Sequence, residues 1–306
     1  MSEMKQTEMP SVSPYLVIGV GILAVSTSAI LIRWAQAEEV SSIVISAWRT
    51  AVATLIFLPL AWRNHDDELR QMSGQQWGLA ALAGVFLGMH FASWITSLEY
   101  TSVTSSTVLV TTTPIWVGVA SPLFLGERMT RPLRWGIVLS IIGSLIITFG
   151  DAWAGGDTAD LGGDALWGNF LALLGALTIA GYMIIGRRLR ARLSLLSYTS
   201  VVYGSAAVVL LLFAVIRGLP LFGYSPYVYL LLVLMALIPQ VLGHTSFNWA
   251  LRFLPAAFVS VTVLGEPIGA SILAILILGE LPLSPVTAVI GALLIFCGIL
   301  VASRPE

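Results

Sequence analysis

The chain contains two stretches that follow one pattern, TPIWVGVASPLFLGER at residues 113–128 and EPIGASILAILILGEL at residues 266–281. Each has a proline at its second position, continues as an apolar run of helical length, and includes Leu-Gly-Glu near its end. The stretches lie 153 residues apart, which is half the length of the 306-residue chain. The matched residues are Pro114 and Pro267, Gly126 and Gly279, and Glu127 and Glu280. This spacing indicates that the chain is built from two related halves.

The composition is that of a protein surrounded by lipid. Hydrophobic residues make up 57% of the chain and charged residues 10%, and the mean hydropathy is +0.91. A soluble domain carries roughly 25% charged residues, so this chain has too few to cover a water-facing surface. The net charge of -1 gives no basic excess for nucleic acid. The single cysteine, Cys297, excludes an intrachain disulfide, and its apolar surroundings predict a small buried residue.

Ten apolar runs are long enough to cross a bilayer, whose core of about 30 Å needs about 20 helical residues. The runs cover residues 15–32, 42–62, 77–97, 104–125, 133–149, 165–185, 196–216, 227–250, 256–278 and 286–302. The first run ends at Arg33, without the small-residue cleavage site of a signal peptide, and we interpret it as a retained membrane helix. The sequence therefore predicts an all-α integral membrane protein of ten transmembrane helices.

The distribution of Lys and Arg predicts the orientation of these helices. If both termini lie in the cytoplasm, Arg33 and Arg217 lie outside and Arg49 lies within a helix. All other basic residues among the 15 then lie inside. They are Lys5, Arg63, Arg70, Arg128, Arg131, Arg134, Arg187, Arg188, Arg190, Arg192, Arg252 and Arg304. Because cytoplasmic loops are enriched in basic residues, the sequence predicts a multi-pass membrane protein with cytoplasmic termini.

The repeat and the helix count together predict an inverted architecture. Five helices per half is an odd number, so the second half enters the membrane from the opposite face. The predicted parts are a cytoplasmic N-terminal tail at residues 1–14, a first five-helix repeat at 15–149, an outer linker at 150–164, a second repeat at 165–302, and a tail at 303–306. Inverted repeats of this kind place a binding site near the bilayer midplane, between the halves.

These motifs resemble those of the drug/metabolite transporter superfamily, of the EamA type with two domains. The resemblance rests on Leu-Gly-Glu after the fourth and ninth helices, Trp48-Arg49 in the second helix, Gly265-Glu266-Pro267 in the ninth, and the count of ten helices. It covers nearly the whole chain. It implies a secondary transporter that exports amino acids or related small metabolites across the bacterial inner membrane by alternating access.

Arg49 and Glu266 are the strongest candidates for contact with a cargo. Inserting a charged side chain into a bilayer costs about 2.5–3.5 kcal/mol on insertion scales. A charge inside a membrane helix is therefore a candidate for a functional site. Arg49 lies on a stripe of small and polar residues at helical spacing, Ser42, Ser46 and Ala53, which we expect to face the interior. Its guanidinium can bind a carboxylate of the cargo, or it can be a structural cation. Glu266 can bind an amine, carry a coupling proton, or pair with Arg49.

Further candidates for substrate binding are His90 and Trp94 in the third helix and His244 and Asn248 in the eighth. In each pair the two residues are four positions apart and share one helix face. Imidazole can relay protons, but a histidine inside a membrane can also be a structural hydrogen-bond partner. Aromatic residues that could line an amphipathic cavity are Trp48, Trp94, Trp116, Tyr182, Tyr203 and Trp249.

Four residues are predicted to have structural or gating roles. Pro114 and Pro267 remove a backbone donor inside a membrane helix and favour a kink. Glu127 and Glu280 end corresponding helices near opposite membrane faces, where each can pair with a loop arginine in one conformation.

The sequence contains no motif of a membrane-embedded enzyme, and it predicts no catalytic residue, metal site or cofactor. His-Glu-x-x-His, Gly-x-Ser-x-Gly and a phosphate-binding Gly-rich Lys loop are all missing from it. The expected partners are a small-molecule substrate, the lipid bilayer and, as a coupling ion, protons. We expect a monomer, since two inverted halves can form a complete pathway. The alternative function is a channel or a membrane sensor without coupled transport.

Overall fold

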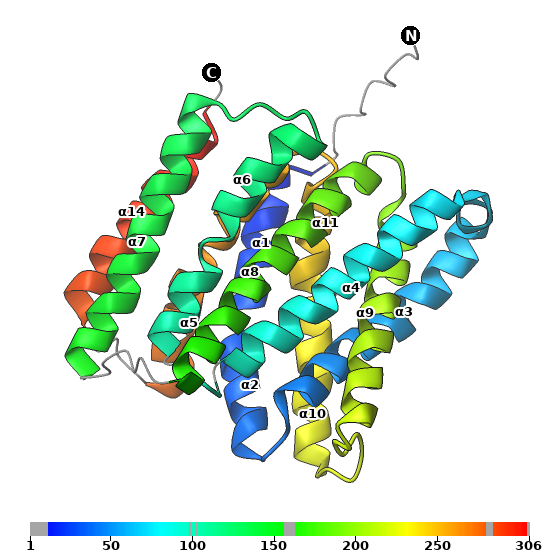
Figure 1. Cartoon of the computed structure of the whole chain (residues 1–306), viewed down its shortest axis with the longest axis horizontal. Coiled ribbons are helices and arrows are strands. Elements are labelled where there is room, and N and C mark those ends of the chain that lie inside the picture. The colour runs from blue at the N-terminus through cyan, green and yellow to red at the C-terminus, as the bar shows by residue number, and fades with distance from the viewer. Residues whose placement is uncertain (1–11, 98, 102, 156–162, 280–283, 305–306) are drawn as a thin grey trace.

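The computed structural model describes residues 12–97, 99–101, 103–155, 163–279 and 284–304, and these ranges are almost entirely helical (Figure 1). No strand occurs in them. The elements are α1 (Pro14–Ser26), α2 (Ser28–Ala37), α3 (Ser42–Gln71), α4 (Gly74–Ser97), α5 (Val103–Val110), α6 (Thr113–Phe124), α7 (Arg131–Gly155), α8 (Gly163–Arg190), α9 (Leu195–Ile216), α10 (Pro226–Met235), the π-helix η1 (Ala236–His244), α11 (Thr245–Ala250), α12 (Ala256–Val263), α13 (Glu266–Leu273), the π-helix η2 (Ala274–Leu278) and α14 (Pro285–Ala302).

Eight helical stretches within the described residues are long and apolar enough to cross a membrane. They are Pro14–Ala37, Ser42–Gln71, Gly74–Ser97, Asp164–Arg190, Leu195–Ile216, Pro226–Ala250, Ala256–Ile277 and Pro285–Ala302. The two remaining predicted runs are also helical, as the pair α5 and α6 and as the 25-residue α7. The prediction of a multi-pass helical membrane protein is therefore confirmed.

Several helices extend past their predicted apolar runs. α3 continues from residue 62 to Gln71 through a kink at His65, where the backbone is not helical. This extension is polar and connects α3 to the start of α9. There Glu68 accepts hydrogen bonds from the backbone N–H of Ser194 (2.6 Å) and the hydroxyl of Ser197 (3.0 Å). α7 likewise extends to Gly155, into the stretch assigned to the outer linker.

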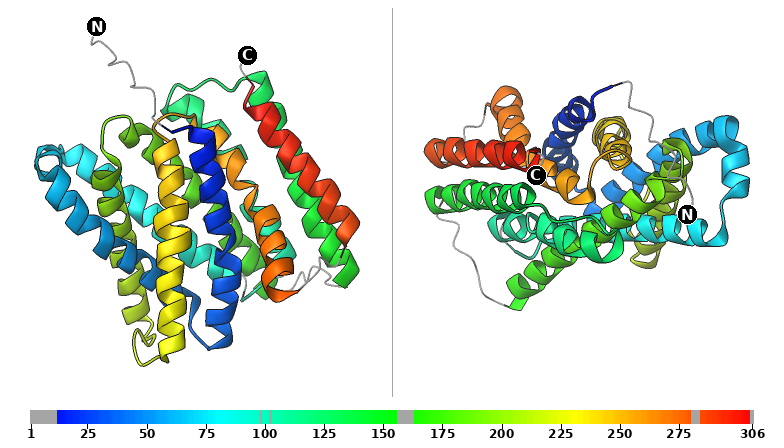
Figure 2. Two further views of the ribbon diagram at one scale, coloured as in Figure 1. Left: turned by 180° about the vertical axis from the view of Figure 1, so that it is seen from behind. Right: turned by 90° about the horizontal axis from the view of Figure 1, so that it is seen from above.

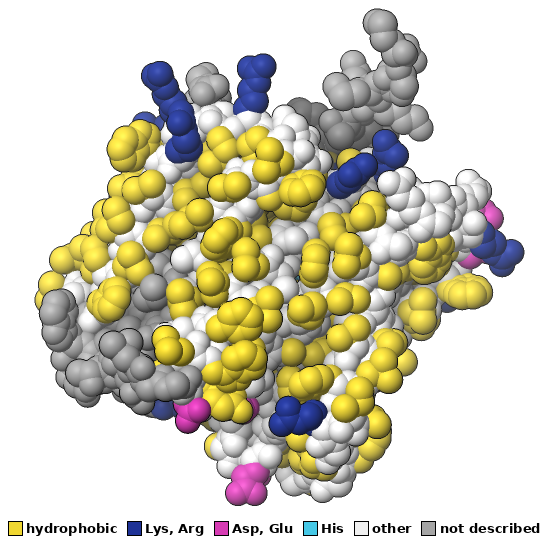
Figure 3. Space-filling model, viewed as in Figure 1, with side chains coloured by type: hydrophobic (Ala, Val, Ile, Leu, Met, Phe, Trp, Pro, Cys, Tyr) yellow, Lys and Arg dark blue, Asp and Glu magenta, His cyan; other side chains and the backbone are white. Residues whose placement is uncertain are grey.

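The helices expose many large apolar side chains, as expected where lipid is the solvent. Exposed residues include Leu55, Leu123, Ile216 and Leu276. Apolar side chains cover much of the face shown in Figure 3. Cys297 also lies exposed, on the face of α14 that presents Leu293 and Leu300 outward. The prediction that Cys297 is buried is wrong, because apolar surroundings in the sequence do not distinguish the core from the lipid-facing surface.

Two predicted helices are broken at equivalent positions. The run at residues 104–125 breaks at Thr111 and Thr112, and the run at 256–278 breaks at Leu264 and Gly265. These breaks lie 153 residues apart, just before Pro114 and Pro267. Proline cannot donate the backbone hydrogen bond that a continuous helix needs at this point. In the first break, the Thr113 hydroxyl donates to the Val110 carbonyl (2.8 Å), which is the carbonyl that Pro114 leaves without a backbone donor.

α1 begins and α14 ends on the same side of the bundle (Figures 1 and 2). Basic side chains gather at this end of the molecule in the view of Figure 3. α7 and α14 lie side by side at one edge of the bundle in Figure 1, while α3, α4 and α9 form the opposite edge.

α7 and α14 cross at two pairs of glycines. A Cβ on Gly136 would lie 2.6 Å from the Gly298 carbonyl oxygen, and a Cβ on Gly143 would lie 2.6 Å from that of Gly291. The earlier glycine of one helix therefore meets the later glycine of the other, so the two helices run antiparallel. Close backbone contact of this kind gains van der Waals energy where lipid removes the hydrophobic drive for association.

α3 and α9 form a second antiparallel pair. Thr54 lies beside Gly204, the rings of Phe57 and Tyr203 are 5.7 Å apart, and the end of α3 contacts the start of α9 through Glu68. The stripe of Ser42, Ser46, Arg49 and Ala53 on α3 is buried, as predicted.

We predict that Gly143→Ala destabilises the protein by about 1–3 kcal/mol, because the new methyl group overlaps backbone atoms of α14 that cannot move aside without parting the helices. The measurement is the thermal unfolding of the purified protein. Gly78→Ala on α4 is the matched control, since a Cβ there has no neighbour within 4 Å. Equal melting temperatures for the two variants would contradict the close crossing.

Candidate functional site

A cavity of about 260 Å³ lies inside the bundle and is lined by helices from both halves of the chain. Its polar lining includes Arg49 of α3, His90 of α4, Tyr182 of α8, His244 of η1 and Glu266 of α13. Threonines at the break between α5 and α6 also reach it. The structure therefore brings into one cavity Arg49 and Glu266, which the sequence separates by 217 positions.

Arg49 is the most fully buried charge that lines this cavity, with 2% of its surface exposed. Its Nε donates to Oε1 of Gln240 at 2.6 Å, and its Cζ lies 4.4 Å from the centre of the Phe91 ring. These contacts hold the guanidinium by one hydrogen bond and one cation–π interaction. Its Nη2 has no hydrogen-bond partner among the described residues. A buried guanidinium with an unused N–H group is suited to bind an anionic ligand group.

Gln240 was not found by the sequence analysis, although it fixes the position of Arg49. It lies on η1, is fully buried, and its Nε2 has no partner in the part of the chain that the structure describes. Its signal in the sequence is a neutral amide beside Pro239 in an apolar run, which stands out less than an ionisable side chain would. Buried amides in a membrane need partners as charged groups do.

Glu266 begins α13, directly after the break in its helix. Its backbone carbonyl accepts a hydrogen bond from the Ser26 hydroxyl (3.1 Å). Its carboxylate makes no hydrogen bond or ion pair with any described residue, and it does not pair with Arg49. Pro267 lines the cavity beside it. Opposite charges thus face the same cavity while remaining apart, which leaves both available to a ligand.

His90 is held by a hydrogen bond and by stacking. Its Nδ1 lies 3.0 Å from the carbonyl oxygen of Gly175 on α8. A carbonyl can only accept, so Nδ1 carries the proton and Nε2 is left as the other polar atom of the ring. The ring stacks on Trp94, with centroids 5.8 Å apart and planes at 9°. Trp94 also lines the cavity, as the sequence analysis expected of a binding residue.

His244 reaches the cavity from the end of η1. Its ring meets Phe91 edge-on at 5.4 Å and lies 6.2 Å from Phe247. Its two nitrogens have no hydrogen-bond partner among the described residues. The Phe91 ring therefore contacts His90, His244 and Arg49, and it is the apolar centre of the site.

Asn248 lies behind the cavity and does not line it. Its Oδ1 accepts from the Tyr182 hydroxyl at 2.5 Å, and its Nδ2 donates to the Tyr203 oxygen at 3.1 Å. The Tyr203 hydroxyl lies 3.0 Å from that of Thr245. Asn248 thereby fixes Tyr182, whose ring does line the cavity.

Of the six aromatic candidates, Trp94 and Tyr182 line the cavity. Trp48 donates to the Leu221 carbonyl (2.9 Å) near the edge of the bundle, and Trp116 donates to the Thr112 hydroxyl (3.1 Å). Tyr203 lies in the buried network, and Trp249 packs on Phe253.

Glu127 connects three helices at one end of the bundle. Its Oε1 accepts from Nε of Arg187 at 2.5 Å, and its Oε2 accepts from the backbone N–H of Ala256, the first residue of α12, at 3.1 Å. Arg187 also donates to the carbonyls of Leu251 and Arg252. Pro114 is buried at the start of α6. Glu280 lies outside the described residues.

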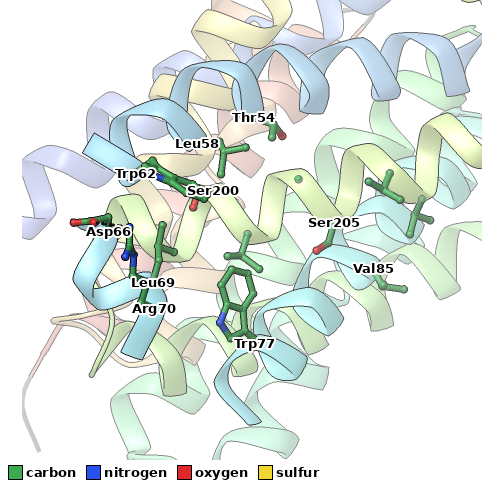
Figure 4. Close-up of a pocket in the computed structure, with 14 residues that line it drawn as sticks. Thr54, Leu58, Trp62, Asp66, Leu69, Arg70, Trp77, Val85, Ser200 and Ser205 are labelled. Carbon is green, nitrogen blue, oxygen red and sulfur yellow. Dashed lines mark ion pairs between the residues drawn. The ribbon is translucent and has the colours of Figure 1, made fainter. Parts of the chain in front are cut away.

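A larger groove of about 730 Å³ lies on the outside of the bundle, between α3, α4 and α9 (Figure 4). Its walls include Trp62 and Trp77, and Asp66 and Arg70 form an ion pair (3.3 Å) at its end. None of the predicted binding residues lines it. We therefore assign the inner cavity, and not this groove, as the candidate binding site.

A bundle of apolar helices around a largely apolar cavity with a few charged and polar side chains suits a membrane transporter, and comparison with known proteins agrees. The EamA-like transporter family matches residues 12–149 and, again, residues 166–304. The chain belongs to this family.

Two relatives and one solved structure extend the comparison. An uncharacterized transporter of Clostridium kluyveri is 26% identical over 81% of this chain and 78% of its own length. A riboflavin transporter of Brucella anthropi is 24% identical over 50% of this chain and 56% of its own. A crystal structure with 16% sequence identity superimposes with a TM-score of 0.79 over 96% of this chain and 98% of its own, which shows a shared fold. This EamA-like chain is thus a membrane transporter and not an enzyme.

We predict that Glu127 and Arg187 are energetically coupled, by about 1–3 kcal/mol, because their side chains are only 18% and 24% exposed and share a short hydrogen bond. A double-mutant cycle with Glu127→Ala and Arg187→Ala, read by thermal unfolding, measures the coupling. The control cycle uses Asp66→Ala and Arg70→Ala, an ion pair that is 41% and 71% exposed and should contribute less than about 1 kcal/mol. Additive effects at Glu127 and Arg187 would show that this contact is incidental.

Proposed function

We propose that this protein is a secondary transporter that exports amino acids or related small metabolites by alternating access. The observation that carries the proposal is the cavity, in which Arg49 offers an unpartnered Nη2 and Glu266 an unpartnered carboxylate. An amino acid has one carboxylate and one ammonium group, and it could satisfy both side chains at once. A pathway for bulk ions would not need two opposite charges held apart inside a bilayer.

The proposed architecture has ten crossings in two inverted five-helix repeats, at residues 15–149 and 165–302, joined by an outer linker at 150–164. The family matches each half separately. The helix breaks at Thr111 and Leu264 are 153 residues apart. α7 and α14 end their respective halves and run antiparallel where their glycines meet, as inversion requires.

In the proposed site, Arg49 binds the cargo carboxylate, and Glu266 binds its ammonium group or carries an exchanged proton. His90, Trp94 and His244 surround the remainder of the cargo together with Phe91. Asn248 acts on the cargo through Tyr182, since both polar atoms of its amide are already hydrogen-bonded to tyrosines.

Gating would use the ends of the broken helices. The proline breaks let the halves of each broken helix tilt without losing buried backbone hydrogen bonds. Glu127, bound to Arg187 and to the start of α12, would close one face of the pathway. Glu280 is the sequence equivalent of Glu127 in the second half, and we propose that it has the same role at the opposite face.

We further propose that both termini are cytoplasmic and that the protein acts as a monomer in the cell inner membrane. The start of α1 and the end of α14 lie on one side of the bundle, where basic side chains gather. Basic residues favour the cytoplasmic face.

We predict that Arg49→Ala raises the KM for an amino-acid cargo by roughly 10- to 100-fold. This factor corresponds to the free energy lost when a buried hydrogen bond to a charged group is removed. The cargo is first found by counterflow of labelled amino acids in proteoliposomes. Arg49→Lys should recover only part of the affinity, because it keeps the charge and loses the planar N–H pair. Arg217→Ala, on an exposed arginine outside the cavity, is the control.

Unchanged transport by Arg49→Ala at equal reconstitution would remove Arg49 from the mechanism. Riboflavin, the substrate named for the Brucella relative, carries no carboxylate and should not compete with the amino acid. Counterflow of riboflavin but of no amino acid would overturn the proposed cargo class.

We predict that Glu266→Gln abolishes the response of transport to a pH gradient, because an amide cannot carry a proton. The measurement is flux in proteoliposomes with the gradient imposed in either direction, and Glu38→Gln in an exposed loop is the control. A variant that binds cargo poorly yet keeps the wild-type response to the gradient would exclude Glu266 as the proton carrier.

A further inference from the structure

A second pocket, of about 850 Å³, lies at the end of the bundle where α8 finishes. Four arginines line it: Arg187 and Arg188 from α8, Arg192 from the following turn, and Arg252 from the turn after α11. The only acidic residue in its lining is Glu127. The pocket is therefore strongly basic, and it is separate from the candidate transport cavity.

Most of this positive charge has no counter-charge among the residues that the structure describes. Glu127 is already bound to Arg187 and to the backbone N–H of Ala256. Arg188, Arg192 and Arg252 are exposed and make no ion pair with any residue that the structure describes. Like charges that line one pocket repel one another, and an anion bound between them would offset this repulsion.

The pocket also has an apolar wall that continues onto the outer surface of the bundle. Phe124, at the end of α6, lines the pocket and is 66% exposed. Since α6 and α8 both end here, the pocket lies where membrane helices leave the hydrocarbon, with polar groups on one side and lipid-facing side chains on the other. A water-soluble anion would use the arginines and leave the Phe124 wall uncovered.

We propose that this pocket binds an anionic phospholipid, with the phosphate between Arg188, Arg192 and Arg252 and an acyl chain against Phe124. Basic pockets between membrane helices are suited to lipid phosphates, because each arginine near the surface contributes to attraction. In the orientation proposed above, the lipid belongs to the inner leaflet. Its phosphate would lie beside the contact between Arg187 and Glu127.

The test is binding of phosphatidylglycerol and phosphatidylethanolamine to the purified full chain, measured by native mass spectrometry during titration. We expect phosphatidylglycerol to bind on the order of 10- to 100-fold more tightly. The triple variant Arg188→Ala, Arg192→Ala, Arg252→Ala should lose this preference. The control is Arg63→Ala, Arg134→Ala, Arg304→Ala, which removes the same charge from exposed positions outside the pocket.

Reversing a single charge with Arg192→Glu gives a second test that needs only one exposed substitution. This variant should lose the preference for phosphatidylglycerol, and its control, Arg134→Glu, should keep it. Phe124→Ser should weaken binding of phosphatidylglycerol as well. The proposal is overturned if the wild-type chain shows no preference between the lipids, or if pocket and control variants lose it equally. It is also overturned if glycerol phosphate, which has no acyl chain, displaces phosphatidylglycerol at equal concentration, since the site would then be one for a soluble anion.

Discussion

The burial of one permanently charged side chain inside lipid organises the centre of this molecule. A guanidinium cannot lose its proton in a protein, so Arg49 has to be solvated by the chain itself. Small residues on α3 make room for it, η1 brings Gln240 to its Nε, and α4 places Phe91 against its face. These three contacts leave Nη2 of Arg49 without a hydrogen-bond partner among the described residues. The protein thus stabilises the charge without neutralising it.

The described helices divide into those that form the cavity and those that support it. Lining residues come from α1, α2, α3, α4, α8, η1, α11 and the two broken helices, whereas α7, α9, α10 and α14 contribute none. The supporting set includes the crossing of α7 and α14, where glycines bring the two backbones into contact. Both broken and continuous helices therefore line the cavity, and α7 and α14, packed through glycine, form one edge of the bundle.

Much of this arrangement could be predicted from the sequence, and the omissions have a common physical reason. The helical runs, Arg49, Glu266 and both histidines were found because charge and polarity inside lipid carry a large and visible energetic cost. Gln240 and Phe91 were missed because a neutral amide and an apolar ring do not stand out in an apolar run. The positions of Asn248 and Cys297 depend on which helix face turns inward, and uniformly apolar helices have little periodicity to reveal it.

The outward position of Cys297 has a practical consequence for probing the pathway. It is the only thiol in the chain, and it lies among lipid-facing side chains of α14, a helix that supplies no cavity residue. Maleimides react with the thiolate, which hardly forms in hydrocarbon. A cysteine introduced beside the cavity would therefore react with a water-soluble maleimide against a nearly silent background. Solvent access from each side of the membrane could be mapped without first removing the native residue.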